Sequence, residues 1–248
     1  MEKKYILTEE AKEVGGHILH RIQAMRDFGG VQKGDLGGWV ESEENLSHDG
    51  DCWIFDNGRV FDNGRVFGDG RVFGDGRVYD NGWVFGDGEV YDNGKVSGNG
   101  KVFDNGWVYD NGWVFGNGEV YGNGRVFGNG EVYGNGRVSG DGKVFGNGEV
   151  YDNGWVFGDG WVFGNAKIGF NAYISSPRSY FVQGPIGSRN DFLTCYLDKD
   201  KKIYAVTGCF CGSIEVFVKK VKAVHGMNRW AKQYLKAAEM ARVMLSGD

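Results

Sequence analysis

The sequence has few of the residues on which covalent cross-links, metal centres and general-base catalysis depend. Its 248 residues include 4 cysteines, 4 histidines and 2 prolines. The cysteines lack the paired C-x-x-C spacing of zinc sites, so we expect reduced, buried thiols and no metal; they are Cys52, Cys195, Cys209 and Cys211. Acidic side chains outnumber basic ones by 33 to 28, and the net charge of -5 argues against a dominant nucleic-acid-binding surface.

Long apolar runs are also missing. Because no stretch of about 18 apolar residues is present, we expect no membrane-spanning helix. The N-terminal segment MEKKYILTEEAKEV is charged and has no long apolar core, so we expect no signal peptide and a cytoplasmic location.

Glycine, in contrast, is abundant and strictly periodic, with 45 residues in the chain. A β-branched residue returns every six residues from Ile54 to Ile174, at 21 consecutive positions without an insertion. Two residues before each stands a small residue: Cys52, then Gly58 to Gly160 at every step, then Ala166 and Ala172. Val40 and Leu46 extend the pattern backwards, and the eight-residue step from Leu46 to Ile54 predicts a two-residue bulge between them.

A period of six fits neither a helix nor a continuous strand, but it fits a short strand followed by a tight turn. The glycine and the valine of each unit lie two apart and therefore face the same side. The turns read DN, GN or GD before glycine, residues that tolerate positive φ. Three turns close a triangle, so the repeat predicts about seven coils of 18 residues and a shaft roughly 34 Å long at about 4.8 Å per coil.

The segments on either side of the repeat differ in composition and divide the chain into three parts. Residues 1–38 read as a small β cap, with strands at 5–8 and within 17–25, and residues 39–176 form the repeat. Residues 177–248 read as a hairpin around residues 198–202 followed by two helices, a ββαα module. The first helix is expected to begin after Ser213 and to end at Gly226, and the second to begin after Asn228.

The repeat resembles the left-handed β-helix of hexapeptide-repeat proteins, in which an aliphatic residue points inward and a small residue stands two before it. The segment KGDLGGWVESEENLS (33–47) resembles bacterial and phage members that are often labelled transferases by fold analogy. GPIGSRND (184–191) together with GCFCGSIEVF resembles a module found with them. The resemblance implies a mainly β fold with a left-handed triangular solenoid and a bacterial or phage-infected cell as the location, with a virion left open; it transfers the fold better than the chemistry.

Acyl transfer is the enzymatic activity that this resemblance implies, and it requires a general base. Residues 56–165 contain no histidine or cysteine and no insertion that could form a lid. His48, at the bulge, is the histidine we expect nearest a coil edge, and a polar turn residue explains it better than catalysis. We therefore predict no catalytic residue and no cofactor. A tight turn also explains GPIGSRND better than phosphate binding does, since it lacks the Walker spacing.

Two carboxylate-based alternatives are weaker. A glycosidase pair is disfavoured because the repeat's aspartates exchange freely with asparagine and glycine. A calcium ladder is conceivable at the corner where residues 18 apart are mostly acidic, but the nonapeptide calcium repeat is absent. That corner comprises Asp51, Asp69, Asp87, Asn105, Asn123, Asp141 and Asp159.

The outside of the coil carries the remaining pattern. A phenylalanine or tyrosine follows nearly every valine, with exceptions that include Ser97 and Ser139. Stacked coils would turn these rings into ladders, which stabilise the shaft and offer an apolar surface to a partner. The residues that we predict to bind are Trp53, Trp83, Trp107, Trp113, Trp155, Trp161, Tyr91 and Tyr109.

Three functions remain open. The first is a non-catalytic solenoid that binds a protein or a carbohydrate through its outer aromatic residues, with a homotrimer as a further expectation. The second is a hexapeptide-repeat acyltransferase. The third is a phage-encoded acidic shaft that inhibits or sequesters a host component.

Overall fold

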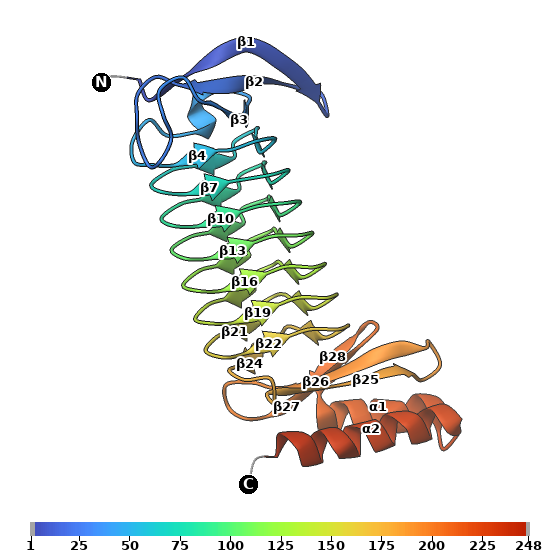
Figure 1. Ribbon diagram of the computed structural model, residues 1–248. Coiled ribbons are helices and arrows are strands. Elements are labelled where there is room, and N and C mark those ends of the chain that lie inside the picture. Colours follow the sequence, from blue (N-terminus) through green and yellow to red (C-terminus); the bar gives the residue numbers. More distant parts are fainter. Residues whose placement is uncertain (1–2, 247–248) are drawn as a thin grey trace.

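The repeat forms a straight shaft with three parallel β-sheets as its sides (Figure 1). The computed structural model describes residues 3–246. Each unit contributes a strand of two residues, and each strand pairs in parallel with the strand one coil, or 18 residues, further on. The shaft is therefore a β-solenoid with a hydrogen-bonded ladder along every side, as the period of six predicts.

The three sides of the shaft take their strands in turn along the chain. The first side contains β3 (Leu36–Val40), β5 (Arg59–Val60), β8 (Arg77–Val78), β11 (Lys95–Val96), β14 (Trp113–Val114), β17 (Glu131–Val132), β20 (Glu149–Val150) and β23 (Lys167–Ile168). The second contains β4 (Trp53–Ile54), β7 (Arg71–Val72), β10 (Glu89–Val90), β13 (Trp107–Val108), β16 (Arg125–Val126), β19 (Lys143–Val144) and β22 (Trp161–Val162). The third contains β6 (Arg65–Val66), β9 (Trp83–Val84), β12 (Lys101–Val102), β15 (Glu119–Val120), β18 (Arg137–Val138), β21 (Trp155–Val156) and β24 (Tyr173–Ile174).

The interior consists of valine and glycine, as predicted. Every repeat valine from Val60 to Val162 is buried, with at most 1% of its surface exposed. Glycine precedes it because a Cβ would meet the backbone of the next coil: at Gly106 it would lie 2.5 Å from the Val120 carbonyl oxygen. Ala166 and Ala172 occur in the last two units, beyond which the sheets have no further shaft strand. The close stacking of coils therefore explains the near-exclusive use of glycine.

The first coil begins before the regular repeat. Val40 pairs with Val60, and Leu46 forms a parallel bridge to Val66. Both residues thus occupy inward positions, and the extra residues lie between Leu46 and β4. With this coil the solenoid has about eight turns, one more than the regular run alone predicts.

The turns use left-handed backbone at their first position, which is occupied by either aspartate or glycine in nearly every unit. Asp104 has a φ of 52° and Gly116 a φ of 59°. At one corner the second turn position forms an uninterrupted amide ladder, in which each side-chain NH2 donates to the next coil's oxygen over 3.1–3.4 Å. Its members are Asn63, Asn81, Asn99, Asn117, Asn135 and Asn153.

The N-terminal cap extends the first sheet with two antiparallel strands, β1 (Tyr5–Val14) and β2 (His17–Ala24), which pair in the order β1-β2-β3. β1 is longer than the strand predicted at residues 5–8. Beneath the cap, the Lys4 ammonium is fully buried, and its Nζ donates to the Cys52 carbonyl over 3.0 Å. A short 3-10 helix, η1 (Glu43–Asn45), follows β3 and leads to the bulge. The cap therefore closes the open apolar end of the solenoid.

The C-terminal module closes the other end (Figure 1). It contains an antiparallel sheet of β25 (Tyr180–Ile186), β26 (Asp191–Leu197), β27 (Ile203–Thr207) and β28 (Phe210–Ser213), followed by α1 (Ile214–His225) and α2 (Arg229–Leu245). One face of the sheet continues the solenoid core through Tyr180 and Tyr196, and the other packs on the helices through Leu193 and Ala205. The predicted hairpin and both helices are confirmed, and β25 and β28 are additional strands whose glycines and proline obscure them in the sequence.

The helix ends follow the predicted caps. Ser213 Oγ accepts a hydrogen bond from the Val216 backbone N–H, and Asn228 accepts from Trp230 and Ala231. None of the helices within residues 3–246 is long and apolar enough to cross a membrane. The four cysteines are free thiols.

Candidate binding surface of the shaft

The aromatic residue after each valine stacks on its counterpart one coil away. Tyr91, Tyr109 and Phe127 follow one another with ring centroids 4.8 Å apart and planes within 4° of parallel. This spacing equals the separation of neighbouring strands, so the rings stack wherever the coils do. Their partial burial shows that the ladders, including Tyr91 and Tyr109, bind the coils to one another.

The serine exceptions are explained by tryptophans of the following coil. The Trp113 indole N–H donates to Ser97 Oγ over 3.0 Å, and the Trp155 indole N–H donates to Ser139 Oγ over 2.9 Å. Both serines are buried, because the indole covers the position that a ring would otherwise occupy. Trp113 and Trp155 are thus fixed parts of the shaft.

The other tryptophans on the outer faces lie in different surroundings. Trp53 is 2% exposed beneath the N-terminal cap, where it packs edge-on against Tyr5 and Phe28. Its prediction as a surface residue is therefore corrected: residue 53 lies on the same side as Trp107 and Trp161, but the cap covers it. Trp83 and Trp161 are each 39% exposed.

Cations reduce the free area of several of these rings. Arg125 lies 4.8 Å from the Trp107 ring centroid, and Lys143 lies 4.7 Å from that of Trp161. Trp113 and Trp155 have similar neighbours. Among the residues that the structure describes, no such cation stacks on Trp83, which is as exposed as Trp161.

Trp83 borders a cavity of about 390 Å³ at the N-terminal end of the third side. Its ring meets Phe67 edge-on at 5.8 Å between centroids. Polar side chains surround this aromatic wall: Glu43, Glu44, Ser47, His48 and Arg65. η1 supplies Glu43 and Glu44, the bulge after Leu46 supplies Ser47 and His48, and strand β6 supplies Arg65.

His48 is held rigidly at this cavity. Its ring stacks on Tyr5 at 4.4 Å, and its Nδ1 accepts the Lys4 backbone N–H over 3.3 Å. An accepting Nδ1 places the proton of a neutral ring on Nε2, which is buried, lacks a hydrogen-bond partner and lies 3.7 Å from Glu43 Oε2. In this tautomer Nε2 is a donor and has no lone pair for a general base.

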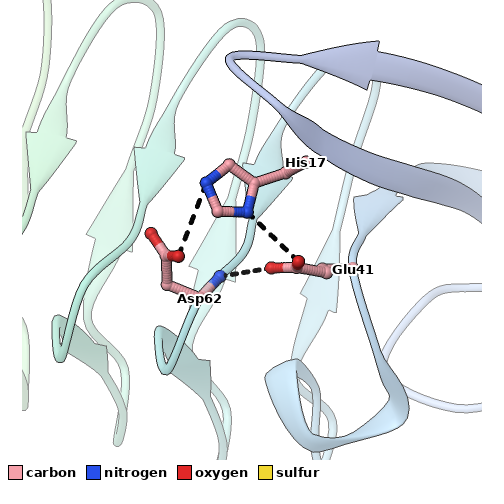
Figure 2. Close-up of side chains that lie close together, drawn as sticks. All are labelled: His17, Glu41 and Asp62. Carbon is pink, nitrogen blue, oxygen red and sulfur yellow. Dashed lines mark hydrogen bonds and ion pairs between the residues drawn. The ribbon is translucent and has the colours of Figure 1, made fainter.

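A second histidine contacts the coils, which the sequence interpretation missed. Figure 2 shows the His17 ring, from the hairpin between β1 and β2, lying between the Glu41 and Asp62 side chains. Nδ1 is 3.1 Å from Glu41 Oε1, Nε2 is 3.5 Å from Asp62 Oδ1, and the Asp62 backbone N–H donates to Glu41 Oε2 over 2.7 Å. No sequence signal marks this contact, because it depends on how the hairpin docks on the second coil.

The His17 cluster is an ion-pair clamp. The hydrogen bond to Glu41 raises the pKa of His17 despite its partial burial. Burial opposes ionisation of Glu41, yet the bonds from His17 and the Asp62 backbone lower its pKa overall. Within residues 3–246, His17, Glu41 and Asp62 are the one group of three or more histidine, cysteine or acidic residues whose possible metal-ligating atoms all lie within 4.8 Å of one another. Both ring nitrogens already face carboxylates from opposite sides, which suits an imidazolium better than a metal ion or a catalytic base.

The corner considered for calcium has a different arrangement. Asn105 donates to Asn123, and Asn123 donates to Asp141 Oδ1 over 3.1 Å. Asp69 Oδ1 accepts the Asp51 backbone N–H over 3.1 Å. These hydrogen bonds give the side chains of Asp69, Asn105, Asn123 and Asp141 protein partners.

Comparison with known proteins gives a limited likeness. A stretch of 66 residues is 33% identical to a protein of Escherichia coli (strain K12) described as an uncharacterized acetyltransferase, YdcK. The match covers 23% of this chain and 20% of that relative, so the chain spans about a fifth of the protein it matches. No family model matches the chain. The likeness agrees with a hexapeptide-repeat solenoid and leaves the activity open.

Proposed function

We propose that the protein is a non-catalytic binding solenoid whose cavity at Trp83 binds a carbohydrate. The exposed Trp83 ring beside a cavity of about 390 Å³ carries this proposal. A sugar ring has an apolar face of C–H groups that can lie on an aromatic ring, while its hydroxyls need charged or polar partners around the edge. The Glu43, Glu44 and Arg65 side chains offer such acceptors and donors.

The chemistry of the surface favours a sugar over a general apolar partner. The Trp83 ring is framed by charged groups beside a cavity, whereas most rings of the ladders are half-buried and Trp107 and Trp161 each have a cation beside them. A protein interface would require a larger continuous apolar core. The homotrimer expected from the resemblance stays a prediction, which a mass measurement in solution tests.

The test is isothermal titration calorimetry with three linear probes: chitohexaose, cellohexaose and maltohexaose. We expect one of them to bind the full chain saturably and Trp83→Ala to weaken that binding at least about tenfold, the effect of losing roughly 1.4 kcal/mol. Trp113→Ala is the matched control, since it removes an outer tryptophan that is bound to Ser97 on another side of the shaft. We expect it to lower the melting temperature and leave affinity unchanged.

Two results would overturn the proposal. If none of the three probes binds, the cavity is not a site for linear oligosaccharides of these classes. Equal loss of binding in both variants would mean that Trp83 acts through stability alone.

The alternative is a hexapeptide-repeat acyltransferase, and the likeness to the uncharacterized acetyltransferase YdcK favours it. His48 would be its base, although the Lys4 N–H on Nδ1 leaves Nε2 protonated in the neutral ring. Acetyl-CoA turnover with amine and sugar acceptors tests it. Turnover that disappears in His48→Ala, while the variant stays folded, would establish the enzyme and displace the binding proposal.

A further inference from the structure

A second cavity, of about 240 Å³, lies in the C-terminal module, far along the chain from the shaft cavity. It is bounded by the turn between β25 and β26, the turn between β27 and β28, and the facing sides of α1 and α2. Its polar wall contains Arg189, Cys209, Lys220 and His225, and its apolar wall includes Phe210 and Val224.

The two turns come together because their glycines allow close contacts. A Cβ on Gly187 would overlap the Tyr234 hydroxyl, and the Gly187 N–H donates to Gln233 Oε1 over 2.9 Å. A Cβ on Gly208 would lie 2.9 Å from Arg189 Nη1. Gly187 of GPIGSRND therefore has a structural role, as a tight turn predicts, and Gly208 of the next turn leaves room for the arginine of that motif.

The charged side chains that line this cavity are all cationic, and the Asp191 carboxylate lies beside the Gly208 turn outside the lining. Its described lining has an arginine, a lysine and a histidine and no aspartate or glutamate, in a chain with a net charge of -5. Neither Arg189 nor Lys220 takes part in any ion pair found within residues 3–246. Lys220 Nζ lies 5.4 Å from the Phe210 ring centroid, so a cation and an aromatic face stand side by side.

Cys209 lies at the charged end of the cavity and can report on its contents. Its thiol is exposed, and Arg189 Nη1 lies 3.6 Å from its Sγ. The hydrogen bond from Arg189 lowers the pKa of Cys209, and the charge of Lys220 acts in the same direction. An anion that paired with these cations would remove their support for the thiolate and slow its reactions.

We propose that this cavity binds a small amphiphilic carboxylate, with its carboxylate between Arg189 and Lys220 and its apolar body against Phe210 and Val224. Val224 is 66% exposed, which leaves apolar surface for such a ligand to cover. The Arg189 guanidinium and the Lys220 ammonium suit a carboxylate, and the aromatic neighbour distinguishes an aryl or alkyl acid from a bare anion. The site is independent of the carbohydrate cavity, which lies at the other end of the shaft.

The probe of occupancy is the reaction of Cys209 with the neutral reagent 4,4'-dithiodipyridine. The thiolate sulfur attacks one sulfur of the reagent, forming a mixed disulfide and releasing 4-thiopyridone, whose absorbance gives the rate. Cys209→Ser identifies the fast phase, since the other three cysteines are buried or half-buried. The rate is measured with the full chain against increasing 3-phenylpropanoate.

We expect 3-phenylpropanoate to slow the Cys209 phase saturably at millimolar concentration, while acetate, inorganic phosphate and 3-phenylpropanol do not. Lys220→Gln should raise the half-saturating concentration about tenfold, the usual scale for loss of a charged hydrogen bond. Lys219→Gln removes the same charge from a neighbouring exposed residue outside the cavity lining. This variant should leave the half-saturating concentration within about twofold of the wild-type value.

Several results would overturn the proposal. Equal protection by acetate or phosphate would show that the site binds any anion, and equal protection by 3-phenylpropanol would show an apolar pocket alone. Absence of saturable protection, or equal effects of the two lysine variants, would each reject the site. A melting-temperature increase of Cys209→Ser with 3-phenylpropanoate is a second readout that does not depend on the thiol, and its absence would also count against binding.

Discussion

Replacing Gly106 with alanine tests the physical reason for the glycine repeat. The new Cβ would lie 2.5 Å from the Val120 carbonyl oxygen, 2.9 Å from the carbonyl carbon and 3.1 Å from the Phe103 oxygen. All three neighbours are backbone atoms, so the coils must separate to admit the methyl group. Separation would stretch bonds such as that from the Phe103 N–H to the Val120 carbonyl, now 3.0 Å.

Overpacking of this kind costs about 1–3 kcal/mol. The reduced backbone freedom of alanine in the unfolded chain offsets about 0.4–1 kcal/mol of that cost. The net loss is therefore about 1–2 kcal/mol, and the melting temperature of a chain of this size should fall by about 2–8 °C. Circular dichroism during thermal and urea unfolding measures both quantities.

Gly76→Ala is the matched control for this substitution. It has the same place in the repeat, but its nearest neighbours would be the Phe73 and Val90 oxygens at 3.0 Å and Val72 Cγ1 at 3.1 Å. The neighbours there need to yield by only a few tenths of an ångström, so we expect a smaller loss. Wild-type stability of Gly106→Ala, or equal losses at the two positions, would refute the claim that coil-to-coil contact requires glycine.

Three further predictions concern the shaft and its N-terminal cap. Ser97→Phe should destabilise the chain by about 1–3 kcal/mol, because the new ring would compete with the Trp113 indole for the same position. In a Trp113→Glu background the same substitution should cost less. A double-mutant cycle measured by urea unfolding that shows no coupling between the two positions would contradict this. The His17 clamp should stabilise the chain most between the carboxylate pKa and pH of about 6.5, and this stabilisation should disappear as the pH rises through the raised folded-state pKa of His17. The melting-temperature difference between wild type and His17→Gln should therefore shrink from pH 6 to pH 8.5, and a difference that grows over this range would reject the clamp. Asn117→Ala removes two bonds of the amide ladder and should lower the free energy of unfolding, measured in urea, by about 1–2 kcal/mol. Asn57→Ala is the control and should leave the free energy of unfolding nearly unchanged, because its side chain forms none of the ladder bonds described for residues 3–246.

The solenoid could be predicted from the sequence because each unit repeats one local rule. The valine faces inward, the preceding glycine admits the next coil, and the turn residue adopts positive φ, so a single period determines the three sheets. The early start of the shaft could also be predicted from the sequence, since Val40 and Leu46 already occupy inward positions before the bulge. The division of the chain at residues 38 and 176 stays a prediction.

The candidate sites were harder to predict because they depend on contacts between distant segments. His17 meets Asp62 only when the cap hairpin docks, and Trp53 is covered by the same docking. Arg189 and Cys209 come from two turns that meet at one end of the C-terminal sheet. The spacing of 16 residues from Ser97 to Trp113 and from Ser139 to Trp155 was a usable signal, although Trp83 has Phe67 at the equivalent position.

The most direct test of the carbohydrate-binding proposal is a crystal structure of the full chain with the oligosaccharide that binds it most tightly. We predict one sugar ring against the Trp83 indole, with its hydroxyls bonded to Glu43, Glu44 or Arg65. A sugar bound at another part of the shaft, with the Trp83 cavity unchanged, would contradict the proposal.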